Sequence, residues 1–194
     1  MTGQRTCGSC SLCCKLMAVH ELSKGVGEWC GHIKRGAGCG FYENRPASCR
    51  AFHCEWLTNA TIPEGWRPDK TKFLISLENQ GARIKIQVDE NTPGAWRLEP
   101  YYSFIKRLSQ RCLNGDRVIV CIGPRRIYIF PDKDIDLGPV SDGANIYSGF
   151  HETPRGMISY ARVLTKEEAA KLSGAQTVAE PRRILQTPGR APPN

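Results

Sequence analysis

Eight of the ten cysteines in this chain lie between positions 7 and 54. Closely spaced thiols constrain a fold because they can converge on one soft metal centre, either along a helix face or through tight turns. Four of the eight form a single C-x-x-C-x-x-C-C run at Cys7, Cys10, Cys13 and Cys14. The others follow at Cys30, Cys39, Cys49 and Cys54. We expect all eight to be metal ligands.

The cellular compartment of the protein affects whether its cysteines bind metal or form disulfides. No apolar stretch reaches the roughly 18 residues that a membrane-spanning helix needs. The amino terminus, MTGQRTCGSC, has no apolar core of a secretory signal. We therefore expect a cytoplasmic protein with no membrane partner. In a reducing compartment cysteines bind metals more often than they form disulfides, although a disulfide framework is the main alternative.

The chain is basic, with 27 Lys and Arg against 19 Asp and Glu and a formal net charge of +8. Ligating cysteines are thiolates, so eight of them holding metal ions would offset part of this charge. No dense Lys/Arg run marks a stripe that would bind nucleic acid. We expect a metal ion as the partner, no nucleic acid, and leave a protein partner open.

Three parts follow one another along the chain. Residues 1–60 are rich in cysteine and glycine and show little periodicity, so we expect a cysteine-cluster metal-binding module. Residues 61–174 show helix and strand patterns and predict a small α+β domain. Residues 175–194 contain four prolines and few apolar side chains, so we expect a disordered tail.

The middle part predicts its elements in some detail. From Leu98 to Cys112, apolar residues recur at helical spacing and indicate one main amphipathic helix. Four strands are expected, at 73–77, 83–88, 118–122 and 127–130. A last helix should begin at Thr165, where Glu168 completes a capping box, and end at Gly174. The predicted fold class is α+β: an irregular cysteine-rich module packed on a small antiparallel or mixed sheet with one main helix.

The thiols favour zinc, copper(I) or an iron–sulfur cluster over calcium or magnesium. Three cluster motifs fail: the ferredoxin and radical-SAM spacings would both need a cysteine where Met17 stands, and a zinc ribbon would need a second C-x-x-C. Neighbouring Cys13 and Cys14 rarely share one tetrahedral ion, so they serve two ions or one of them stays unligated. The eight cysteines could form two four-sulfur sites, or one site and a partly open one.

A longer pattern carries a family resemblance. After the C-x-x-C-x-x-C-C run come Trp29-Cys30 and then Cys39-x-x-Tyr42-Glu43-x-Arg45-Pro46-x-x-Cys49-Arg50-x-Phe52. Residues 7 to 57 thereby resemble the YkgJ-like cysteine-cluster proteins, a group described as a zinc- or iron-chelating domain. The resemblance implies metal binding through the cysteines and does not decide between the two metals. Flagellin lysine N-methylases are similar in this region, which implies an iron–sulfur or methyl-transfer alternative.

Other side chains are weighed against ordinary structural roles. His20, His32 and His53 lie in or beside the cysteine-rich part and are candidate ligands, although eight thiols make them unnecessary. Arg45 and Arg50 either screen thiolates or form ion pairs with neighbouring glutamates. The two remaining cysteines, Cys112 and Cys121, fall on apolar faces and should be small buried hydrophobes.

The predicted function is soft-metal binding. Zinc is preferred over iron or a [4Fe-4S] cluster because closed all-cysteine ligation is typical of structural zinc sites. Two alternatives come from other classes: an iron–sulfur or iron-dependent redox or group-transfer enzyme, and a zinc-stabilised module that binds protein or nucleic acid. A metal with three protein ligands and one open position would favour the enzyme.

Overall fold

The computed structural model describes residues 5–154 and 156–175. The chain divides into two compact units, Met1–Val163 and Leu164–Asn194, which are described separately. Among the described residues, no helix has both the length and the apolar character needed to cross a bilayer. Nearly all of the predicted tail, 175–194, lies outside the described residues. The predicted division near residue 60 stays a prediction.

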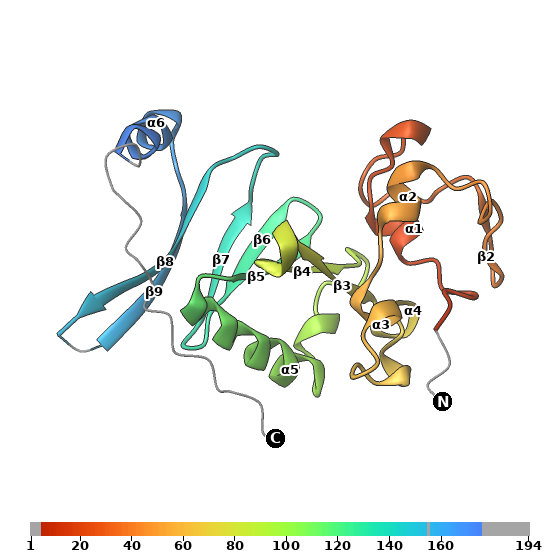
Figure 1. Ribbon diagram of the computed structural model, residues 1–194, viewed down its shortest axis with the longest axis horizontal. Coiled ribbons are helices and arrows are strands. Elements are labelled where there is room, and N and C mark those ends of the chain that lie inside the picture. The colour runs from red at the N-terminus through yellow and green to blue at the C-terminus, as the bar shows by residue number, and fades with distance from the viewer. Residues whose placement is uncertain (1–4, 155, 176–194) are drawn as a thin grey trace, which may run out of the picture. The chain divides into compact units, whose positions relative to one another are not determined.

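The first unit is built on a five-stranded sheet (Figure 1). Its strands lie in the order β3-β4-β5-β6-β7. Only β4 and β5 pair in parallel, and the other neighbours are antiparallel. The strand bounds are β3 Phe73–Glu78, β4 Arg83–Val88, β5 Arg117–Ile122, β6 Arg125–Ile129 and β7 Asp134–Pro139. The sheet is therefore mixed, and the α+β prediction is confirmed.

One face of this sheet forms the main core. Side chains alternate along each strand, so every second residue of β4, β5 and β6 points to the same side. These positions are apolar and buried: Ile84, Ile86, Val88, Val118, Val120, Ile127 and Ile129. Trp96 and Ile105 are fully buried in the same cluster. Trp96 belongs to the short helix η4 Ala95–Arg97, and Ile105 to α5 Tyr101–Leu108.

Helix α5 is the predicted main helix, and it lies beside the sheet between β4 and β5 along the chain (Figure 1). It occupies the middle of the predicted range, and the chain continues as a 3₁₀ helix, η5 Ser109–Asn114. Gly115 ends this segment at φ 92°, a left-handed conformation that glycine adopts at no steric cost. The long connection allows β4 and β5 to pair in parallel, because parallel neighbours need a crossover.

The opposite face of the sheet is polar at one end. Alternation places on it the side chains Glu78, Arg83, Lys85, Arg117, Ile119, Cys121, Arg126 and Tyr128. Beyond the main sheet, β8 Ile146–Thr153 and β9 Gly156–Val163 form an antiparallel hairpin. Neither this hairpin nor β7 was predicted. Strand β7 does alternate at Asp134-Ile135-Asp136-Leu137, but the stretch is only four residues long, whereas β8 and β9 mix polar, glycine and apolar residues without a clean alternation.

The second unit contains helix α6, Lys166–Ala175. The predicted capping box is confirmed: the backbone N–H of Glu168 donates to Thr165 Oγ1 at 3.2 Å. In return, the backbone N–H of Thr165 donates to Glu168 Oε2 at 2.8 Å. The first turn thus has two of its free N–H groups satisfied.

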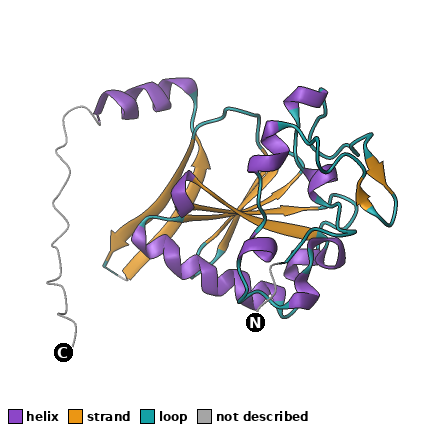
Figure 2. Cartoon of the chain, turned by 45° about the vertical axis from the view of Figure 1, so that its right-hand side comes forward, coloured by secondary structure: helices purple, strands orange, loops and turns teal. Residues whose placement is uncertain are grey.

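The head, residues 5–60, consists mainly of loops and turns, which Figure 2 shows on its right-hand side. Its elements are short: α1 Cys13–Leu16, η1 His20–Leu22, β1 Ile33–Lys34, β2 Gly38–Cys39, α2 Ala47–Ala51 and α3 Glu55–Thr58. Leu12 and Leu16 of the head bury themselves against Leu74 of β3. The connection back to the sheet adds η2 Glu64–Trp66 and α4 Pro68–Thr71.

A buried ion pair also joins the head to the sheet. Lys15 Nζ on α1 lies 2.5 Å from Asp89 Oδ1, just after β4. Only 8% and 11% of the two side chains are exposed. The backbone N–H of Asn91 donates to the same carboxylate oxygen at 2.9 Å. The ammonium group also lies 5.5 Å from the ring centre of Trp29, whose own side chain is largely exposed.

Candidate metal centre

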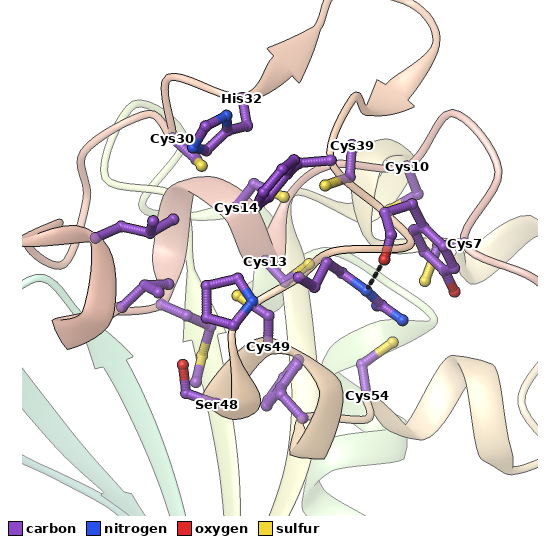
Figure 3. Close-up of a pocket in the computed structure, with 18 of the residues that line it drawn as sticks. Cys7, Cys10, Cys13, Cys14, Cys30, His32, Cys39, Ser48, Cys49 and Cys54 are labelled. Carbon is purple, nitrogen blue, oxygen red and sulfur yellow. Dashed lines mark hydrogen bonds between the residues drawn. The ribbon is translucent and has the colours of Figure 1, made fainter.

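The eight cysteines of the head line a single cavity of about 140 Å³ (Figure 3). They are Cys7, Cys10, Cys13, Cys14, Cys30, Cys39, Cys49 and Cys54. All ten cysteines of the chain are free thiols. Cys112 and Cys121 lie elsewhere and are buried, which confirms the prediction that they pack as small hydrophobes. The fold therefore gathers in one place the residues that the sequence separates by up to 47 positions.

Tight local geometry brings the first cysteines together. The backbone N–H of Cys10 donates to the carbonyl of Cys7 at 2.9 Å, which closes a turn through Gly8. The turn containing Gly38 packs directly on the carbonyl of Gly8, so a Cβ at Gly38 would overlap that oxygen. Gly38 also has φ 90°, which disfavours any other residue. This close approach places Cys39 beside the first turn of the cysteine run.

The remaining cysteines reach the cavity from separate short elements. Cys13 and Cys14 open α1, and the N–H of Cys30 donates to the carbonyl of Cys14 at 3.1 Å. Cys49 lies on α2, which follows Pro46, a residue that suits a helix start. Cys54 occupies the position before α3. Figure 3 shows these side chains around the cavity.

We divide the eight sulfurs into two groups of four by the neighbours that they share. Cys10, Cys13 and Cys54 pack together against the leucine cluster. Burial raises the pKa of Cys54, and the nearby thiols of Cys10 and Cys7 raise it further. The first group is therefore Cys7, Cys10, Cys13 and Cys54.

The second group lies around Cys49. Burial raises the pKa of Cys49, and the thiols of Cys14, Cys30 and Cys39 act in the same direction. In Figure 3, Cys7, Cys10 and Cys54 lie on one side of the cavity, and Cys14 and Cys30 lie on the other. The adjacent residues Cys13 and Cys14 thus belong to different groups.

Cys13 of the first group and Cys14 of the second group are adjacent in sequence and interact through a hydrogen bond. The Cys13 thiol donates to Cys14, and this bond lowers the pKa of Cys14 to about 7. The positive charges of Lys24 and Arg45 also lower it. The same hydrogen bond, together with burial, raises the pKa of Cys13 far above its usual range. One thiol of the pair is therefore ready to ionise near neutral pH, which is the form that binds metal.

Lys24 provides a fixed positive charge beside the second group. Its ammonium group donates to the carbonyl oxygens of Lys15 at 3.1 Å and Gly25 at 2.8 Å, and also to that of Met17. All three N–H groups of the ammonium are thus satisfied. Burial lowers the pKa of Lys24, and the nearby Cys30 and Glu28 oppose this shift. Nothing in the local sequence distinguishes Lys24 from a surface lysine, so it was not among the predicted site residues.

Arg45 and Arg50 were predicted either to screen thiolates or to pair with glutamates. Arg45 lines the cavity, stacks on the Tyr42 ring at 3.7 Å and donates from Nε to the Tyr42 carbonyl at 2.9 Å. Arg50 donates to the carbonyl of Arg45. Within the described parts of the chain, neither arginine forms an ion pair with a carboxylate. The arrangement of Arg45 is therefore the screening one.

The three candidate histidines differ in position. His32 lines the cavity and stacks on Phe41 with ring centres 4.6 Å apart. His53 is exposed, and its Nδ1 lies 3.2 Å from the carbonyl of Ala51. His20 is exposed on η1. Only His32 is placed where it could join the thiols.

The donor set fits a soft metal by chemistry. Its side chains are thiols, with Met17 and His32 nearby and apolar side chains completing the wall. As placed, however, no group of three or more His, Cys, Asp or Glu side chains is spaced to hold an ion in the described residues. Ligation would require the sulfurs to close in to about 2.3 Å from the metal.

Comparison with known proteins adds no relative. No protein-family model, curated protein or solved structure matches this chain. The functional argument therefore depends on the geometry of the cavity and on the chemistry of the residues that line it.

Proposed function

We propose that this protein binds soft metal ions, with zinc as the preferred metal, through the eight cysteines of the head. The observation that supports this is the shared cavity: eight thiols from five separate stretches of the chain surround one space. A common metal ion would account for this gathering, because thiolates placed so close together repel one another unless a cation binds them.

The two groups of four suit two tetrahedral sites. One would use Cys7, Cys10, Cys13 and Cys54, and the other Cys14, Cys30, Cys39 and Cys49. Each zinc would replace thiol protons and join short segments that have little core of their own. Lys24 and Arg45 would offset part of the negative charge that the thiolates of the second site carry.

The test is elemental analysis with an absorption spectrum on protein purified without oxygen. We expect about two zinc atoms per chain and no visible absorption, as four-cysteine zinc sites require. Brown protein with iron and sulfide in near-equal amounts would replace zinc by an iron–sulfur cluster in the proposal. A metal-free protein that does not bind zinc on titration would refute soft-metal binding altogether.

A matched pair of variants assigns the site. Cys49→Ser removes a thiol of the second group and should reduce the bound zinc by about one atom per chain. Cys121→Ser removes a thiol that is buried in the sheet, away from the cavity, and should leave the zinc content unchanged. Equal zinc contents in the two variants would contradict the assignment of Cys49.

A further inference from the structure

A second cavity lies on the polar end of the sheet face opposite the main core. Its volume is about 500 Å³, and none of the eight head cysteines lines it. Strands β4, β5 and β6 supply about half of its lining residues, and the segment 140–146 supplies nearly all of the others. The chemistry-bearing side chains in the lining are Arg83, Lys85, Arg117, Arg126, Cys121 and Tyr128.

Strand register is the reason that positive charges gather here. Arg83 of β4 lies directly opposite Arg117 of β5, and both point to the same face. Lys85 lies two residues after Arg83 on β4, so its side chain points to the same face. Arg126 of β6 lies opposite Cys121 of β5. Like charges that face one another across neighbouring strands destabilise a sheet, so this register has a cost unless an anion compensates it.

Carboxylates in the protein neutralise only part of this charge. Glu78 lies 3.5 Å from Arg83 and 3.3 Å from Lys85, so one carboxylate is shared by two cations. Asp142 also lines the rim. Against four cations in the lining, these two acidic residues leave an excess of positive charge.

Arg117 and Arg126 have neutral partners. Arg117 Nε donates to Ser148 Oγ at 3.3 Å. Arg126 Nη1 donates to the carbonyls of Gly123 at 2.6 Å and Arg125 at 3.1 Å. Neither guanidinium meets a carboxylate among the described residues. Both therefore have N–H donors left for a ligand, because each guanidinium carries five.

One donor of the cavity lining lacks an acceptor in the described part of the chain, and three of the cations lie on the same face of the sheet as one phenol. Arg83 Nε is inaccessible to solvent and has no hydrogen-bond partner among the described residues. Burial raises the pKa of Tyr128, and the guanidinium groups of Arg83, Arg117 and Arg126 oppose this shift. The strand register places all three arginines on the same face of the sheet as this phenol. A buried donor without an acceptor is costly, and an anion near the Arg83 guanidinium would offset part of that cost through its charge.

We propose that this cavity binds a small molecule carrying two negative charges, either a phosphate monoester or a dicarboxylate. The guanidinium groups of Arg117 and Arg126 hold the charged group, since planar forks match phosphate and carboxylate oxygens. Ile119 and the ring of Tyr128 form an apolar wall for the rest of the molecule. The volume lies in the range of small-molecule sites, roughly 300–1,000 Å³.

The experiment is isothermal titration calorimetry of the full-length protein with phenyl phosphate and with phthalate. Both probes carry two charges on an aromatic body, so the tighter of the two identifies the anionic group. Arg117→Gln and Arg126→Gln should each weaken binding by at least about tenfold, because hydrogen bonds between charged groups are the strong ones. Absence of heat with both probes would overturn the proposal.

Arg125→Gln is the matched control, since Arg125 neighbours Arg126 on β6. Its guanidinium pairs with Asp136 at 2.5 Å and does not line the cavity. The Arg125→Gln variant removes the same charge as Arg126→Gln and should leave probe binding unchanged. If it weakens binding as much as Arg126→Gln does, the attraction depends on net charge only and the proposal fails.

Glu78→Gln should increase the affinity for the probe, and a misfolded protein would not show such an increase. It frees Arg83 and Lys85 from their shared carboxylate and removes a negative charge from the cavity wall. The variant should bind the preferred probe several-fold more tightly than the parent protein. Unchanged or weaker binding would contradict the placement of the ligand between these strands.

Discussion

The buried pair Lys15–Asp89 offers the most direct test of how the head is held on the sheet. The perturbation is Lys15→Met, which keeps the length of the side chain and removes its charge. Lys15 lies on α1 between the cysteine run and Leu16, and Asp89 follows β4. The carboxylate of Asp89 would then stay buried, with the N–H of Asn91 as its remaining donor.

The magnitude follows from burial. With 8% and 11% of the side chains exposed, the pair has little screening by water. Removing one partner of such a pair costs about 3–5 kcal/mol, because an uncompensated charge remains inside. With a urea m-value of about 2 kcal/mol/M, a loss of about 4 kcal/mol lowers the midpoint by about 2 M. That is a large part of the roughly 5–15 kcal/mol that stabilises a typical domain.

The assay is urea unfolding followed by far-UV circular dichroism at one metal concentration for all variants. Lys15→Met/Asp89→Asn should recover much of the loss, since it leaves no buried charge. Lys70→Met is the control, because Lys70 is exposed on α4 and should change stability by less than about 0.5 kcal/mol. If Lys15→Met costs no more than the control, the ion pair does not secure the head and the argument from burial is wrong.

Three further predictions concern the head and its connection. Gly38→Ala should destabilise the protein and reduce its zinc content, because the new Cβ overlaps the Gly8 carbonyl at φ 90°; unchanged zinc content by elemental analysis would contradict this. The Arg67 guanidinium, 2.7 Å away, lowers the pKa of Asp69, so this pair stabilises the fold above pH about 4 and the benefit is lost as pH falls through the lowered pKa. Urea unfolding against pH should therefore show Asp69→Asn to be less stable by about 1 kcal/mol or less at neutral pH and equal to the parent in acid, and a constant difference would count against the pair. Removing the metal with a chelator should lower the urea midpoint and increase the reactivity of the thiols toward an alkylating reagent, and protein that is indifferent to the chelator would exclude a structural metal.

Patterns local in sequence predicted much of the scaffold. Strict alternation predicted β4, and the helical spacing of apolar residues predicted α5. Strands β5 and β6 occupy the predicted ranges 118–122 and 127–130 closely, and the chain turns between them at Gly123 with φ 52°. Each of these elements buries one face, so apolar residues recur along its sequence at the spacing of a helix or a strand. The hairpin β8–β9 was missed because its glycines and polar residues hide the period.

The cysteine spacing alone indicated which residues could bind metal, because ligand type and proximity along the chain are local properties. The division of those residues into two groups of four needed the tertiary structure, since Cys54 reaches Cys10 only after the head folds back on β3. The same holds for the parallel register that sets Arg83 beside Arg117. The sequence states which side chains are available. Contacts between segments that are distant in sequence form only when the strands pair and the core packs, and local patterns do not determine which segments then meet.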